Sequence, residues 1–192
     1  RTARAWRPLP SQPRSSSLSA RMDDETAGDT VQTAAEAATR GDVDSLRRYE
    51  GKWDASICAA AAESGQLATL QFLRGAGCDW NEDTCSLAAD GGHLALLQWA
   101  RANGAPWHES TCAAAAEGGH LELLKWAHLN GCPWDESTCS SAAEGGHLEL
   151  LKWAREHGCP WDWTTCSAAA EGEHAAIVEW VLSQEHQQNV GE

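Results

Sequence analysis

Several features are scarce or missing in this chain of 192 residues. Its apolar runs are rich in Ala and far shorter than the roughly 20 residues that a membrane-spanning helix needs. Residues 1–21 lack the apolar core of a secretory signal peptide. No nucleophile with its base, no Gly-rich phosphate loop and no paired catalytic carboxylates occur in recognisable spacing. These absences exclude a membrane span and a secretory signal, and they argue against an enzyme.

Positive charge is also scarce outside the first residues. The net charge is -14, yet residues 1–21 hold five Arg and no acidic residue. An acidic surface repels phosphate backbones and anionic lipids and favours cationic partners. We therefore expect no nucleic-acid ligand and no direct insertion into a membrane.

Residues 1–21 are rich in Arg, Ser and Pro. This composition predicts that residues 1–25 form a disordered basic leader. Two interpretations stay open. The leader is either the remnant of an organelle transit peptide or upstream sequence before a start at Met22, the one Met of the chain.

A period of 27 residues runs through the rest of the chain. One column holds Trp53, Trp80, Trp107, Trp134 and Trp161. A second column holds Cys58, Cys85, Cys112, Cys139 and Cys166. A third holds Gln66, His93, His120, His147 and His174, and a fourth holds Phe72, Trp99, Trp126, Trp153 and Trp180. One period across many columns indicates a repeated structural unit.

Residues 107–131 illustrate the unit, which reads as helix, turn, helix and loop. The polar residue after Trp is Asp54, Asn81, His108, Asp135 or Asp162, and all of these except His108 are good helix N-caps. Gly118 and Gly119 permit a tight turn after the first, Ala-rich helix. Gly131 follows the second helix, where a left-handed residue ends helices most easily.

The segment "TCAAAAEGGHLELLKWAHLNG" resembles the ankyrin repeat. The residues on that family's pattern are Thr111, Ala115, Gly119, His120, Leu121, Leu124 and Gly131. The resemblance implies an all-α fold, an α-solenoid of about six helix-turn-helix units. The usual repeat has about 33 residues, so units of 27 residues should lack the long hairpin fingers. The expected units lie near 26–52, 53–79, 80–106, 107–133, 134–160 and 161–188, with 189–192 as a tail.

The Cys, His and Trp columns favour structural roles over chemistry. Cys132 and Cys139 are too far apart for a common zinc pair, so we expect no metal and no cofactor. Helix spacing excludes disulfides within one column, which indicates a reducing compartment. The loop cysteines, which are Cys78, Cys132 and Cys159, should be less protected and open to surface thiol chemistry. We expect the His column to bond the turn backbone, and the Trp columns to form core between units with their indole N–H groups bonded to loop carbonyls.

The resemblance implies a non-enzymatic scaffold for protein–protein interaction that uses its concave face. Acidic side chains of the first turns should attract a partner with a basic or mixed-charge surface, and Trp163 is expected to be an exposed contact. The predicted binding residues are Glu82, Asp83, His108, Glu109, Asp135, Glu136, Asp162 and Trp163. The alternative function is a fixed structural subunit of a larger complex. The expected location is the cytoplasm or another reducing compartment, or a plastid or mitochondrion if residues 1–21 are a transit remnant.

Overall fold

A computed structural model describes residues 33–189 of the chain, with side chains as far as residue 184. The predicted leader, residues 1–25, and residues 190–192 of the predicted tail lie outside these described residues. Within the described range, every regular element is a helix. No helix there is both long enough and apolar enough to cross a membrane.

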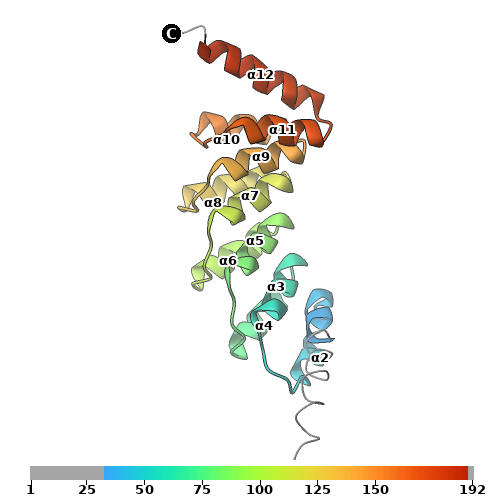
Figure 1. Ribbon diagram of the computed structural model, residues 1–192. Coiled ribbons are helices and arrows are strands. Elements are labelled where there is room, and N and C mark those ends of the chain that lie inside the picture. The colour runs from blue at the N-terminus through green and yellow to red at the C-terminus, as the bar shows by residue number, and fades with distance from the viewer. Residues whose placement is uncertain (1–32, 190–192) are drawn as a thin grey trace, which may run out of the picture.

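The helices form pairs that stack in chain order along one elongated array (Figure 1). Residues 33–40 are helical and pair with α2, Val43–Arg47. The first helices of the next five pairs are α3 (Ala55–Glu63), α5 (Glu82–Asp90), α7 (Glu109–Glu117), α9 (Glu136–Glu144) and α11 (Trp163–Glu171). The second helices are α4 (Leu67–Gly75), α6 (Leu94–Ala102), α8 (Leu121–Leu129), α10 (Leu148–Glu156) and α12 (Ala175–Asn189). The predicted α-solenoid of about six helix pairs is confirmed.

The first helices begin at side-chain caps, although the caps are not all the predicted ones. Asp54, Asp135 and Asp162 each accept a hydrogen bond from the backbone N–H two residues ahead, at 2.9, 3.0 and 2.8 Å. The prediction was wrong for the other two positions. His108 does cap its helix, because its Nδ1 accepts from the Ser110 N–H at 3.1 Å. The Asn81 side chain instead donates to the Asp83 carboxylate at 2.8 Å and makes no capping bond.

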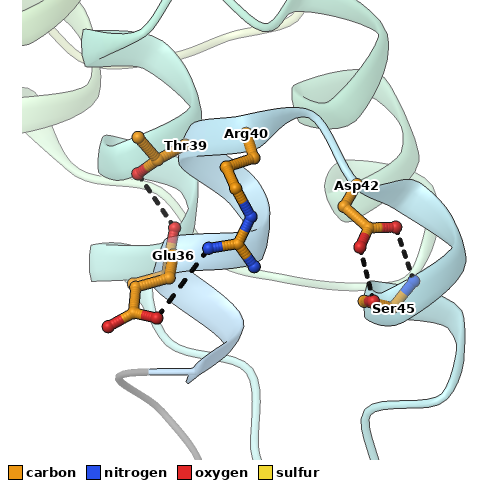
Figure 2. Close-up of polar contacts among 6 residues, drawn as sticks. Glu36, Thr39, Arg40, Asp42 and Ser45 are labelled. Carbon is orange, nitrogen blue, oxygen red and sulfur yellow. Dashed lines mark hydrogen bonds and ion pairs between the residues drawn. The ribbon is translucent and has the colours of Figure 1, made fainter.

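The first described pair has local polar contacts of its own (Figure 2). The Asp42 carboxylate accepts from the Ser45 N–H at 3.0 Å and so caps α2. Thr39 donates to the Ala35 carbonyl at 3.0 Å, and the exposed Arg40 guanidinium lies 3.9 Å from Glu36. An exposed ion pair of this kind contributes little to stability, so the contacts shape the end of the array more than they hold it together.

The second helices α4, α6, α8 and α10 are each followed by a left-handed glycine, as predicted. Gly131 has a φ of 81°, a conformation that costs a residue with a Cβ but not glycine. The next amide, Cys132 N–H, reaches back to the Ala127 carbonyl at 3.0 Å. This turn feeds the chain directly into the next first helix, and no strand separates successive pairs in the described residues. The expected absence of hairpin fingers is therefore confirmed for this part of the chain.

The core runs along the array between the two rows of helices. It consists mainly of Ala, Cys and Leu side chains that are fully buried, such as Cys112, Ala115 and Leu124. The first helices α3, α5, α7, α9 and α11 pack directly against one another, whereas each second helix mainly contacts its own first helix. Small Ala and Ser side chains on the first helices permit this close approach. We call the exposed side of these five helices the first-helix face.

Candidate functional site

From α3 to α11, the basic side chains belong to only one of the two rows of helices. The five first helices hold nine acidic residues and no Lys or Arg. The second helices α4, α6, α8 and α10 carry the basic side chains Arg74, Arg101, Lys125, Lys152 and Arg155. The second helices also hold Glu122, Glu149 and Glu156, so acidic side chains lie on both rows and basic ones on the second row alone. The first-helix face therefore has no internal counter-charge of its own.

A row of carboxylates that the sequence analysis did not select marks the end of each first helix. This C-terminal acid row consists of Glu63, Asp90, Glu117, Glu144 and Glu171. All five are exposed, and none has an ion-pair or hydrogen-bond partner for its carboxylate among the described residues. The row keeps the period of 27 residues and stands at the start of the "EGGH" turn, so the periodicity could have revealed it.

The predicted binding residues lie at the opposite, N-terminal ends of the same helices. Glu82, Asp83, Glu109 and Glu136 are exposed in the first turns. His108, Asp135 and Asp162 occupy the cap positions, where their side chains are engaged by backbone amides. Trp163 is exposed over 75% of its surface. The structure therefore spreads the predicted residues over four successive helix starts and does not gather them into one pocket.

A shallow groove lies between α3 and α5 on the first-helix face. Its volume is about 320 Å³, and its lining includes Ala59, Ala60, Ser86 and Leu87. Glu63 also lines it, from the C-terminal acid row, and so does Asp83, from a first turn. The groove is thus floored by short side chains and bordered by carboxylates.

The His column connects neighbouring units at the turns. The His120 Nε2 bonds the Asp90 carbonyl at 2.8 Å, and the other bonds of the column join His93 to Glu63, His147 to Glu117 and His174 to Glu144. Gln66 makes the corresponding contact with the Thr39 carbonyl at 3.4 Å. The predicted backbone bonding is confirmed, and the acceptor belongs to the end of the preceding unit's first helix. These bonds also hold the helix ends that carry the acid row.

The Trp columns have a different environment from the one predicted. They are half-buried at the edge of the core, and no hydrogen bond from an indole N–H is present in the described residues. Instead, Arg101 lies over the Trp107 ring at 4.0 Å, and Arg74 and Arg155 repeat this contact at 4.1 and 4.3 Å. His128 takes the same place and stacks on Trp134 at 3.8 Å. These pairs link each second helix to the next unit and leave the first-helix face free of aromatic rings before Trp163.

The prediction that the loop cysteines are less protected than the inner cysteines was wrong. Cys78, Cys132 and Cys159 have exposures of 0%, 3% and 0%. Each lies against the inner cysteine of its own unit, because the loop folds back over the start of the first helix. Among the described residues, no group of three or more His, Cys, Asp or Glu side chains is arranged to hold a metal ion.

Stacked helix pairs, left-handed glycines after the second helices and His bonds at the turns define a helical repeat of the ankyrin type. Among solved structures, the chain is similar to the human ASB11 ankyrin repeat domain, with a TM-score of 0.61 and 17% sequence identity. The similarity covers 78% of this chain and 82% of that domain. No protein-family model and no curated protein sequence matches the chain. The resemblance to ankyrin repeats is thus confirmed at the level of the fold.

Proposed function

We propose that this protein is a non-enzymatic scaffold that binds a protein partner through the first-helix face. The partner supplies an extended segment rich in Lys or Arg. The observation that carries the proposal is the one-sided charge of the five first helices, which hold nine acidic residues and no Lys or Arg. Residues in both rows of carboxylates take part, including Glu82, Asp83, Glu109 and Glu136 from the prediction.

The C-terminal acid row supports a binding role because it opposes the stability of the free protein. A carboxylate at a helix C-terminus faces the negative end of the helix dipole, which is unfavourable. Neighbouring packed helices have axes about 8 to 10 Å apart, so carboxylates at equivalent positions of successive first helices repel one another. A cationic segment relieves both effects when it binds, so the cost in the free protein becomes a gain in the complex. Nucleic acid would meet only repulsion on this face.

A peptide-binding assay tests the proposal. The probe is a fluorescent peptide of alternating Lys and Ala residues, followed by anisotropy between 50 and 300 mM salt. We expect affinity to fall as salt rises. The triple variant Asp90→Asn, Glu117→Gln, Glu144→Gln should bind at least tenfold more weakly than the native protein.

The matched control carries Glu122→Gln and Glu149→Gln on the second helices, where each carboxylate is already paired with a Lys at 2.7 and 2.8 Å. This control should bind nearly as well as the native protein. Equal losses in both variants, or binding that does not respond to salt, would refute the assignment of the first-helix face. Crosslinking of the native protein at its source would then identify the partner and its contact face together.

A fixed subunit of a larger complex is the second candidate function, and the far end of the array favours it. Ala170 is exposed there, although its counterparts Ala62, Ala89, Ala116 and Ala143 are fully buried. Leu182 is 44% exposed, and a hollow of about 470 Å³ opens beside it. A permanent partner would co-purify in fixed stoichiometry, whereas a scaffold's partner would exchange with added competitor.

A further inference from the structure

Three units of the array each contain a pair of buried thiols. The Cys58 Sγ donates to the Cys78 Sγ at a distance of 3.2 Å, and both residues are fully buried. Cys112 lies beside Cys132, and Cys139 beside Cys159, at the same two positions of their units. Within each pair, one cysteine comes from the first helix and the other from the loop that leaves the second helix of the same unit. Each pair thus joins a cysteine of the inner column to a loop cysteine. Helix spacing excluded disulfides only between cysteines of one column.

The backbone holds the loop thiol in place. Cys78, Cys132 and Cys159 each point at the carbonyl of the residue that caps their own unit's first helix, at 3.0, 3.5 and 3.4 Å. The sulfurs of Cys58 and Cys78, 3.2 Å apart, need to approach by only about 1 Å to reach bonding distance. A bond between them would require a small side-chain rotation rather than a movement of helices.

One unit lacks the loop cysteine and therefore serves as an internal control without a thiol pair. Ala105 occupies the loop position of the unit that contains Cys85, and both residues are fully buried. The fold therefore accepts Ala where the other units have a loop cysteine. Cys85 and Cys166 have no hydrogen bond to another thiol in the described residues.

We propose that each thiol pair is a redox modification site, which peroxide converts to a disulfide within one unit. One thiolate attacks a peroxide oxygen, the O–O bond breaks, and a sulfenic acid and water result. The sulfur of the second cysteine then attacks the sulfenic sulfur, and the S–O bond breaks to release a second water. Each pair loses two protons and two electrons, and hydrogen peroxide is reduced to two molecules of water. The products are the disulfides Cys58–Cys78, Cys112–Cys132 and Cys139–Cys159.

Burial makes this reaction slow, so the pairs stay reduced until oxidant persists. The bond to Cys78, together with burial, raises the pKa of the Cys58 thiol well above its usual value. The contact with the partner thiol and burial likewise raise the pKa of Cys112 and of Cys159. The same contacts lower the pKa of Cys78 and of Cys139, which makes these two the attacking thiolates of their pairs. Because the thiolate is the reactive form, oxidation depends on local opening and becomes faster at higher pH. Once formed, each bond closes a loop that contains the later part of the first helix and the whole second helix, and it restrains that unit against unfolding.

Counting free thiols tests the proposal. The folded protein is treated with hydrogen peroxide at pH 8, quenched, unfolded in guanidinium and alkylated with iodoacetamide, and its intact mass is measured. We expect the alkylated thiols to fall from eight to two, which are Cys85 and Cys166. Peptide mapping should recover the three named disulfides.

Two variants serve as matched controls. Cys132→Ala copies the natural Ala105 and should fall from seven alkylated thiols to three. Ala105→Cys adds a partner for Cys85 and should fall from nine to one. Eight thiols that stay free in the folded native protein would overturn the proposal. So would sulfinic acids at these positions, disulfides between other cysteines, or disulfides that join two molecules.

Discussion

Helix α7 allows a direct comparison of the two rows of carboxylates, because the same substitution can be made at each end. Glu109 is its first residue and Glu117 its last, and both are exposed. Each also faces carboxylates of the neighbouring units. We predict that Glu117→Gln stabilises the free protein relative to Glu109→Gln.

The magnitude follows from two contributions. Repulsion between carboxylates about 10 Å apart in water is about 0.4 kcal/mol per neighbour, and 0.1 M salt lowers it to roughly 0.15 kcal/mol. This relief is similar for both variants and cancels in their comparison. The helix dipole does not cancel, because it contributes about 0.3 to 1 kcal/mol of opposite sign at the two ends.

The two variants should therefore differ by about 0.6 to 2 kcal/mol in their free energy of unfolding, the Glu117→Gln protein being the more stable. For a protein of this size, this is a difference in Tm of roughly 1 to 8 °C. Thermal unfolding followed by circular dichroism at 222 nm measures it. Equal shifts for both variants, or a lower Tm for Glu117→Gln, would refute the view that the acid row is maintained against stability. A partner peptide should reverse the order of the two variants, since Glu109→Gln retains the full C-terminal acid row and Glu117→Gln does not.

Three further outcomes are expected. His120→Ala removes the bond to the preceding helix end and should lower the urea unfolding free energy by about 1 kcal/mol, whereas His120→Gln, which copies Gln66, should lose less than half of that. Glu173 has a φ of 59° where the five other units have Gly, so Glu173→Gly should raise the unfolding free energy by about 1 kcal/mol. A loss would show that the Glu173 side chain is held by contacts. Burial lowers the pKa of His128, and the nearby His157 lowers it further by a smaller amount. The neutral His128 side chain therefore contributes to stability above about pH 6.5, and this contribution is lost as the pH falls. His128→Arg should then lose less stability than the native protein between pH 7.5 and 5, and a larger loss in the variant would show that the protonated imidazole is stabilised on the Trp134 ring.

The sequence predicts the repeat more completely than the contacts between repeats. Caps such as Asp135 and turns such as Gly131 act within a few residues, so spacing along the chain is enough to locate them. The His column was predicted for the same reason, but its acceptor lies 30 residues earlier, as in His120 and Asp90. Only the stacking of units brings that carbonyl within reach.

The cysteines and tryptophans make contacts that could not be predicted from the period of a single column. Cys78 is adjacent to a loop in sequence, and a loop position suggests exposure, yet the loop folds back onto Cys58 and buries both thiols. Trp107 lies in a column that suggested core, yet the guanidinium of Arg101 covers its ring. Both contacts join different columns, so the period of one column does not contain them. The candidate site was likewise predicted only in part. The acidic residues of the first turns were predicted because they mark helix starts, whereas the C-terminal acid row was not predicted.

The turn glycines also govern how this array can be lengthened in the laboratory. A Cβ added at Gly146 would lie 2.5 Å from the imidazole of His174 in the following unit, so that glycine is needed because another unit docks there. Glu173 holds the same place in the final turn, where no such ring arrives within the described residues. New modules of 27 residues should therefore be accepted when spliced between existing ones, whereas grafting a module beyond α12 would require Glu173→Gly first.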